Sequence, residues 1–320
     1  MKRRQFTAFA AAAAACAAAP AVLAQDRVTR ILVGFPPGGS ADLVARLLAE
    51  RLRGPLNQNV IVDNKPGAGG RVALQELRRA APDGQTLCLT PSGALVIQPW
   101  LFANLGFDPL KDFSAISRVT VFDFAVTVGP GAPQGDLKAV LAWMKANPGK
   151  ANYATSGAGT VPHFAGVLLS QAAAVPMTHV AYRGGAPAAQ DLIGGQVPMM
   201  IDTASETIEH HKAGKVRIVA VTGEQRSRAL PEVPTLRELG INTTADAFFG
   251  LYGPAGLPAD VASRIDTAVA SVLREAAVQE RITNLGLVAS HAGPADLAAT
   301  QLAHYRRWEA PIKASGFKPD

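Results

Sequence analysis

Two glycine-rich segments carry the residues best suited to binding a small ligand. In the first, ILVGFPPGGSAD at residues 31–42, Pro36 to Gly39 end an apolar strand, and Ser40 opens an amphipathic run. A helix N-terminus presents unpaired N–H groups and the positive end of the helix dipole, so this elbow is suited to holding an anion. An ordinary tight turn with Ser40 as a helix cap is the alternative interpretation.

The second segment is YATSGAGT at residues 153–160, which leads into a helix that contains His163 and Phe164. Small residues and hydroxyls before a helix repeat the design of the first elbow. If the two segments face each other, their helix N-termini converge on one cleft. That geometry suits a molecule with one or two carboxylates, bound mainly by backbone N–H groups and hydroxyls.

Three side chains near these segments have a functional and a structural interpretation. His163 can contact a ligand or pack as a neutral imidazole, and packing is favoured. Asp202 can accept a ligand ammonium or hydroxyl, or cap the next helix. Arg183 can bind a carboxylate through two hydrogen bonds, or brace two lobes. No obvious acidic pair lies near both segments, which argues slightly against amino-acid ligands. Asp202 could still provide a partner for the ammonium group of such a ligand.

Catalytic and metal-binding patterns are missing from the sequence. Neither Ser40 nor Ser156 lies in a G-x-S-x-G elbow, and the glycine runs complete no dinucleotide fingerprint. The pair His210 and His211, beside Glu206 and Glu209, lacks zinc-ligand spacing and indicates a solvated helix end. We therefore expect no catalytic residue, no metal and no cofactor. An exported hydrolase remains the minor alternative.

Residues 1–24 are predicted to be a cleaved signal peptide. A positive start, Lys2 to Arg4, precedes an apolar run over 6–19 and a Val22-Leu23-Ala24 cleavage pattern. Arg3-Arg4 also fits twin-arginine export, and Sec export fits nearly as well. Cleavage leaves 296 of the 320 residues, removes three positive charges and lowers the net charge from +6 to about +3.

The composition of the mature chain excludes some partners. Its basic residues are scattered and its aromatic residues sparse, so no nucleic-acid partner is expected. Cys88 is the one cysteine left after cleavage and lies in an apolar run, which indicates a buried thiol and no intramolecular disulfide.

The expected elements alternate between strands and helices. Strands near 28–35, 60–62 and 86–90 with helices over 41–52 and 71–80 predict a parallel, doubly wound sheet. Right-handed crossovers would bring the first elbow and the loop Pro91 to Gly93 to the same sheet edge.

A second α/β run over 137–221 predicts a second lobe. The apolar strands 124–128 and 248–252 are expected to cross between the lobes, and helices near 259–285, where a break is an open alternative, and 294–312 to return to the first lobe. We predict an α/β protein in which residues 25–122 and 250–320 form lobe 1 and residues 123–249 form lobe 2. Each lobe is expected to be a doubly wound sheet flanked by helices.

Six ordered motifs closely resemble the periplasmic solute-binding proteins of tripartite tricarboxylate transporters, the Bug family. These motifs are FPPGGSAD at 35–42, DNKPGAGG at 63–70, APDGQTL at 81–87, YATSGAGTVPHF at 153–164, YRGGAPAAQDLIGGQV at 182–197 and ALPEVPTLRELG at 229–240. The resemblance implies a two-lobed, type II-like Venus flytrap in the periplasm, expected to be a monomer. It also implies that a small organic carboxylate is captured and delivered to membrane permease subunits, with an orphan receptor for a sensor kinase as the alternative.

Carried over position by position, the resemblance also implies the contact residues. In lobe 1, Phe35 would form a wall of the ligand site. The backbone N–H groups of the elbow would donate hydrogen bonds to the ligand, and Asp42 would be an orienting group. The full set of implied ligand-binding residues is Phe35, Gly38, Gly39, Ser40, Asp42, Ser92, Ser156, Gly157, Thr160, His163, Tyr182, Arg183, Gly184 and Asp202. Ser40 departs from the many relatives that carry Ala there, and the surroundings of Ser92 are less typical of the family. The identity of the carboxylate is left open.

Overall fold

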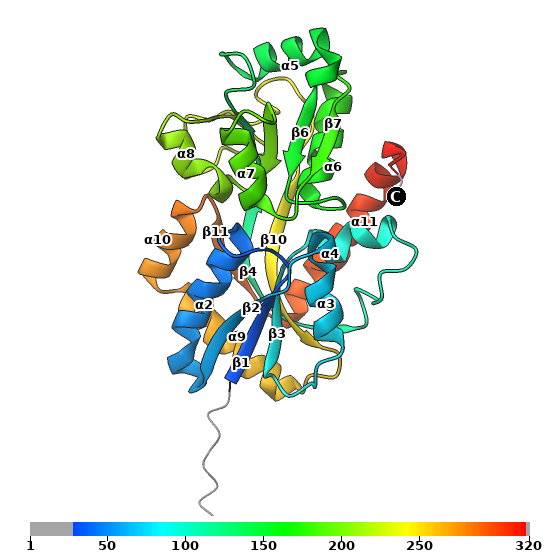
Figure 1. Cartoon of the computed structure of the whole chain (residues 1–320). Helices are drawn as coiled ribbons and strands as arrows, with labels where there is room; N and C mark the ends of the chain where they lie inside the picture. Colours follow the sequence, from blue (N-terminus) through cyan, green and yellow to red (C-terminus); the bar gives the residue numbers. More distant parts are fainter. Residues whose placement is uncertain (1–27, 318–320) are drawn as a thin grey trace, which may run out of the picture.

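Two β-sheets flanked by helices divide the described chain, residues 28–317, into two lobes in the computed structural model (Figure 1). The predicted signal peptide and the first residues of predicted lobe 1 lie outside the described residues. The expectation of an α/β protein with two lobes is confirmed. The boundaries given above for the lobes remain a prediction.

The first lobe is built on a six-stranded sheet of order β11-β4-β10-β3-β1-β2. Its strands are β1 (Val28–Val33), β2 (Asn59–Asn64), β3 (Thr86–Pro91), β4 (Phe113–Asp123), β10 (Asp246–Pro254) and β11 (Val288–Ala292). Its helices are α2 (Ser40–Leu56), α3 (Arg71–Arg78), α4 (Gly93–Val96), α9 (Ala259–Leu273), α10 (Ala276–Asn284) and α11 (Pro294–Ser315), with 3-10 turns η1 (Ala68–Gly70) and η2 (Gln98–Trp100).

The second lobe has a five-stranded sheet of order β7-β6-β8-β5-β9. Its strands are β5 (Ala125–Val128), β6 (Asn152–Thr155), β7 (Thr178–Ala181), β8 (Met199–Asp202) and β9 (Arg217–Val221). Its helices are α5 (Leu137–Ala146), α6 (Val161–Ala172), α7 (Gly185–Ile193) and α8 (Ile208–Lys212), with 3-10 turns η3 (Pro148–Lys150) and η4 (Ala204–Glu206).

Both sheets are mixed, which corrects the expectation of purely parallel sheets. The predicted parallel pairing holds for β1 with β2 and β3, and for β6 with β7 and β8. However, β10 runs antiparallel to β3 and β4, and β5 antiparallel to β8 and β9. The cause is the route of the chain: β4 leads out of the first sheet toward the second lobe, and β10 re-enters the first sheet beside it in the opposite direction.

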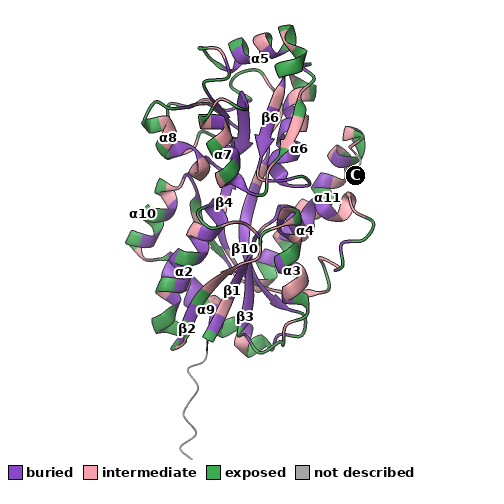
Figure 2. Ribbon diagram, in the orientation of Figure 1, coloured by how far each residue is buried: buried purple, intermediate pink, exposed green. Residues whose placement is uncertain are grey.

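The interior of each sheet is buried, as Figure 2 shows, and the first sheet carries the long helix α2 on its apolar face. Leu48 and Leu52 of α2 are fully buried, in keeping with their helical spacing. Cys88 in β3 is also fully buried, which confirms its prediction as a core thiol, and burial raises its pKa. No helix of residues 28–317 is both long enough and apolar enough to span a membrane.

The side chain of Thr222 links the two crossings between the lobes. Its hydroxyl accepts from the N–H of Phe124 at 2.9 Å and donates to the carbonyl of Ala245 at 2.6 Å. Phe124 lies between β4 and β5, and Ala245 immediately precedes β10. The crossings therefore lie just before the two apolar strands that were predicted to cross. The sequence of an apolar strand does not indicate to which sheet the strand belongs.

The C-terminal helices pack on the first lobe, as predicted, with α9 and α11 against β4. The expected helix over 259–285 is indeed broken, at Arg274 and Glu275, and the short strand β11 was not predicted. Since β11 is a partly exposed edge strand of five residues, its hydrophobic alternation is too weak to identify.

Candidate ligand-binding cleft

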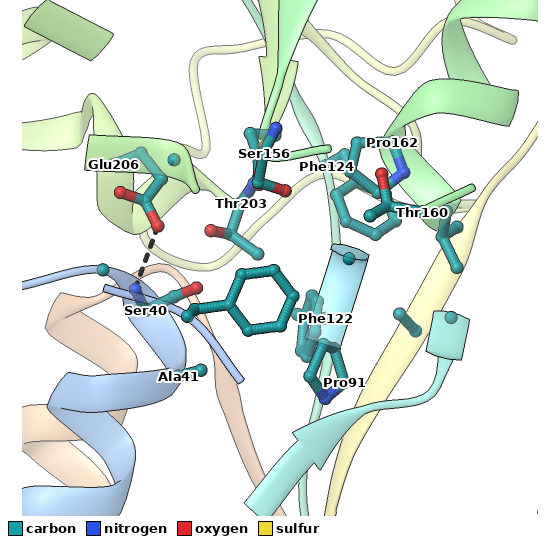
Figure 3. Close-up of a pocket in the computed structure, with 18 of the residues that line it drawn as sticks. Ser40, Ala41, Pro91, Phe122, Phe124, Ser156, Thr160, Pro162, Thr203 and Glu206 are labelled. Carbon is teal, nitrogen blue, oxygen red and sulfur yellow. Dashed lines mark hydrogen bonds between the residues drawn. The ribbon is translucent and has the colours of Figure 1, made fainter. Parts of the chain in front are cut away.

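A cavity lies between the lobes at the carboxyl ends of β1 and β3, where the elbow and the Pro91 loop were predicted to meet (Figure 3). Its volume is about 40 Å³, room for roughly three water molecules. The lining residues from the first lobe side are Phe35, Pro36, Gly39, Ser40, Ala41, Gly69, Pro91, Gly93, Ala94, Phe122, Phe124, Ala247 and Phe249. From the second lobe come Ser156, Thr160, Val161, Pro162, Gly185, Ala186, Asp202, Thr203 and Glu206.

The first elbow is shaped by a carboxylate in the first turn of α2. Asp42 accepts hydrogen bonds from the N–H of Gly38 and the amide of Asn64, both at 2.9 Å, and from Arg46 at 2.8 Å. Burial alone would raise the pKa of Asp42, but these bonds, led by the one from Arg46, lower it. Gly38 adopts a φ of +86°, which favours glycine. The elbow is therefore held in shape before any ligand binds.

The second elbow is closed by a hydroxyl from its own loop. Thr160 is the N-cap of α6: its Oγ1 accepts from the N–H of His163 at 3.4 Å and donates to the carbonyl of Gly157 at 2.7 Å. Ser156 lies four residues earlier and lines the cavity. This loop thus presents Ser156 and Thr160 together.

Two carboxylates of the second lobe face the cavity. Asp202, at the end of β8, accepts from the N–H groups of Ser156 at 2.6 Å and Thr203 at 2.9 Å. Glu206, in η4, accepts from the N–H of Ser40 at 2.9 Å and so links the second lobe to the N-terminus of α2, as the dashed line in Figure 3 marks. Each acid therefore accepts a hydrogen bond from a backbone N–H group of one elbow.

Burial dominates the electrostatics of this acidic pair. It raises the pKa of Asp202 to about 6 and that of Glu206 to about 7, and the charge of Asp202 adds to the rise at Glu206. Among the described residues, no Lys, Arg or His lines this cavity. The pair therefore faces the cavity without a cationic partner.

The opposite side of the cavity is aromatic. Phe35, Phe122, Phe124 and Phe249 line it. The rings of Phe122 and Phe249 lie 4.7 Å apart between centroids, and those of Phe122 and Phe124 5.7 Å apart at a steep angle. Such packed rings form a rigid apolar wall.

A second compartment of about 210 Å³ adjoins the first and shares Phe35, Gly69 and Ser156 with it. Gly157, Tyr182, Arg183 and Arg71 also line this compartment. The guanidinium of Arg71 lies 3.8 Å from the centroid of the Phe102 ring, and Arg183 is exposed. The cleft is therefore acidic in one compartment and basic in its neighbour.

The predicted contact residues divide into three groups. Phe35, Gly39, Ser40, Ser156, Thr160 and Asp202 line the main cavity, and Gly157, Tyr182 and Arg183 line the adjoining compartment. Gly38, Asp42, Ser92, His163 and Gly184 line neither of them. The structure does not bring this last group into contact with the cavity, although Gly38 and Asp42 shape the elbow.

Ser92 and Gly184 lie beside the cavity rather than on its surface. The Ser92 hydroxyl is fully buried without a hydrogen-bond partner among the described residues, while its N–H donates to the carbonyl of Phe248 at 2.9 Å. Gly184, with a φ of +129°, lies against Pro36: a Cβ added there would be 2.6 Å from the Pro36 Cδ. Gly184 therefore allows close approach of the two lobes.

His163 belongs to a third cavity, which Phe317 and His179 also line. Its Nδ1 accepts from the N–H of Gly159 at 3.3 Å, and its ring stacks on His179 with centroids 3.9 Å apart. Burial lowers the pKa of His163 to about 3 and that of His179 to about 4, so both rings are neutral at physiological pH. This arrangement favours the packing role of His163.

Several residues of the cavity were not predicted: Phe122, Phe124, Thr203, Gly185, Ala186, Glu206 and Phe249. Glu206 is the most informative, because the sequence associated it with a solvated helix end and indicated no acidic pair near the elbows. That interpretation was wrong. Asp202 and Glu206 both face the cavity, and their four-residue spacing after a strand end was the available signal. The described residues contain no cluster of three potential metal ligands.

A two-lobed fold with a cavity between the lobes is typical of solute-binding receptors. Residues 44–317 match the sequence profile of the tripartite tricarboxylate transporter family receptor. The chain therefore belongs to this family, as the six motifs predicted, and the family is one of periplasmic solute-binding receptors rather than of enzymes.

Solved structures support the same assignment. The periplasmic binding protein BugD is 32% identical, with a TM-score of 0.88 over 92% of this chain and 99% of BugD. MatC of Rhodopseudomonas palustris, solved with bound malate, is 30% identical, with a TM-score of 0.85 over 89% of this chain and 99% of MatC. An R. palustris protein solved with adipate is 26% identical, with a TM-score of 0.89 over 92% of this chain and 99% of that protein.

Proposed function

We propose that this protein captures a small organic carboxylate in the interlobe cleft and delivers it to the membrane permease subunits of a tripartite tricarboxylate transporter. The proposal rests most directly on the cavity between two lobes between which the chain passes at Phe124 and again at Ala245, two positions paired through Thr222. Opening at these crossings admits a ligand, and closure brings the lobes together around it. The malate- and adipate-bound relatives support a carboxylate as the ligand.

The proposal includes export to the periplasm and cleavage near Ala24. The positive start and apolar run of residues 1–24 support it. N-terminal sequencing of the protein recovered from the periplasm of a producing cell would test it, and a mature start near Gln25 is expected. Full-length protein retained in the cytoplasm would contradict it.

Thermal unfolding of the mature protein in the presence of candidate ligands tests the binding function. The panel contains mono-, di- and tricarboxylates, aromatic acids and amino acids. A specific ligand at a hundredfold excess over its Kd stabilises the native state by roughly 2.7 kcal/mol, which raises Tm by about 4–5 °C for a protein of this size. The protein is first unfolded and refolded so that any bound molecule is removed.

One chemical class that raises Tm would support the receptor function. If no carboxylate raises Tm, and mass spectrometry of the denatured protein finds no released carboxylate, the proposal is wrong. For delivery to a permease, transport into vesicles that contain the small and large membrane subunits should require this protein.

A further inference from the structure

We propose that the ligand of this cleft is a zwitterion with an apolar or aromatic body, its protonated nitrogen against Asp202 and Glu206 and its carboxylate toward Arg71 and Arg183. This inference rests on the proposed function, because it assigns the ligand of the same cleft. It narrows the class from organic carboxylates in general to those that also carry a positively charged nitrogen.

The first argument is the occupation of the elbow N–H groups. The N–H of Ser40 already donates to Glu206, and the N–H of Ser156 already donates to Asp202. A ligand carboxylate placed at these donors would meet two carboxylates of the protein and be repelled. A protonated nitrogen placed there would instead be attracted and could donate to both acids.

The second argument is charge balance. The main cavity is lined by two acids and, among the described residues, by no Lys, Arg or His. The nearest cation on α2, Arg46, is paired with Asp42 behind the elbow. Enclosed charges are normally paired, so the missing partner is expected on the ligand. The raised pKa values of Asp202 and Glu206 agree with a site that lacks a cation.

The remaining surfaces of the cleft indicate the chemistry of the other parts of the ligand. Phe122, Phe124 and Phe249 offer an aromatic wall to an apolar body. The adjoining compartment, with Arg71 and Arg183, lies on the other side of the shared residue Phe35 and suits a carboxylate. A molecule that spans both compartments therefore meets acids at one end and guanidinium groups at the other.

Matched pairs of ligands test the inference by isothermal titration calorimetry of the mature protein. The pairs are 4-(aminomethyl)benzoate with 4-methylbenzoate, 4-(aminomethyl)phenylacetate with 4-methylphenylacetate, and 6-aminohexanoate with hexanoate, whose nitrogen and carboxylate lie at opposite ends, and malate and adipate serve as plain dicarboxylates. In at least one pair, the zwitterion is expected to bind tenfold or more tightly than its deaminated partner.

The sign of the effect of Glu206→Gln is the sharper test. Glutamine keeps the acceptor for the Ser40 N–H but loses the charge, so binding of a zwitterion should weaken about tenfold or more. Binding of a plain carboxylate should stay equal or tighten, because a repelling charge is removed. Asp202→Asn should act in the same direction. The control is Glu209→Gln, which removes an exposed carboxylate paired with Lys212 and should leave both affinities unchanged.

The outcomes separate this inference from the proposed function. A preference for a zwitterion that Glu206→Gln abolishes supports the inference. If plain carboxylates bind as well as or better than every zwitterion, or if the zwitterion binds the Glu206→Gln variant as tightly as the wild-type protein, the inference is wrong and the receptor function stands. If neither kind of carboxylate binds to the wild-type protein, both are wrong.

Discussion

The two elbows of the cleft look alike in sequence but complete their helix N-termini in different ways. At the second elbow, the Thr160 side chain caps α6 from within the same loop. At the first elbow, Gly39 is the N-cap of α2 and offers no side chain, and the N–H of Ser40 is bound by Glu206 from the other lobe. One helix end is therefore self-sufficient, and the other is completed across the cleft.

This difference assigns separate roles to the two elbows. A loop that satisfies its own N–H groups gives a fixed surface, whichever state the lobes adopt. A helix end completed by the opposite lobe changes its partner when the lobes separate, and so links lobe closure to the chemistry of the cavity. Changes at the first elbow should therefore affect ligand binding, and changes at the Thr160 cap should mainly affect stability.

The largest effect is expected from Gly184→Ala, which acts where the first elbow meets the second lobe. The new Cβ would lie 2.6 Å from the Cδ of Pro36, so the lobes could not approach as closely. Affinity for the ligand should fall about a hundredfold or more, because the closed state is penalised. Calorimetry measures the affinity, and small-angle scattering should show a more open protein in the presence of ligand.

The matched control for this variant is Gly214→Ala. Gly214 also has a positive φ, +70°, but a Cβ there meets nothing within 4 Å. It therefore places an alanine at a positive φ without the steric contact, although at a smaller backbone cost than at Gly184, whose φ of +129° and ψ of 166° essentially only glycine adopts. If both variants lose affinity equally, or if neither does, the contact between Gly184 and Pro36 does not control closure.

An intermediate effect is expected from pH, through the acid that completes the first elbow. Burial raises the pKa of Glu206 to about 7 and that of Asp202 to about 6, so between about pH 4 and pH 7 the native state binds more protons than the unfolded state. The protons bound by these two acids therefore stabilise the ligand-free protein at low pH. This contribution to the free energy of unfolding is lost as the pH rises and is on the order of 1 kcal/mol or more.

Chemical denaturation of Glu206→Gln and the wild-type protein at several pH values measures this contribution. The variant should show a flatter fall in the free energy of unfolding between pH 4 and pH 7. Asp123, whose pKa burial raises to about 6, titrates in the same range and contributes equally to both proteins. Identical profiles for the two proteins would show that burial does not raise the pKa of Glu206 in the native state.

A smaller effect is expected at the second elbow from Thr160→Ala. Loss of the cap should cost about 1 kcal/mol of stability, and Thr160→Ser should restore most of it because serine caps equally well. Urea denaturation measures both variants. An unchanged free energy of unfolding for Thr160→Ala would contradict the claim that this helix end is completed by its own loop.

The smallest effect is expected from Arg183→Ala. The guanidinium is exposed, so its attraction for a ligand carboxylate is screened by solvent, and affinity should weaken only a few-fold. Calorimetry at low and high salt measures this change. Complete loss of binding would instead indicate a guanidinium clamp on the ligand.

Much of the fold was predictable because it depends on local patterns. The alternation of apolar strands with amphipathic helices identified both lobes, and the elbow at residues 36–39 was recognisable from its prolines and glycines. The mixed sheets could not be predicted, since the pairing of β10 between β3 and β4 joins residues more than 100 positions apart. No local pattern specifies such a partner.

The candidate site was predictable where it lies on a loop with a motif, as at Ser40, Ser156 and Thr160. It was not predictable where residues reach the cavity from the middle of the fold. Phe122 and Phe249 are ordinary strand residues in the sequence and line the cavity only because the crossings place them there. Glu206 was misassigned because the residues that enclose it, among them Gly185 and Ser40, are distant in the chain.

A crystal structure of the mature protein with the carboxylate identified by thermal unfolding would test the central claim most directly. The account predicts that the ligand lies in the cavity between Phe35, Ser156 and Glu206, with both lobes in contact with it. A ligand bound instead in the third cavity, beside His163 and Phe317, or to one lobe alone, would contradict the account.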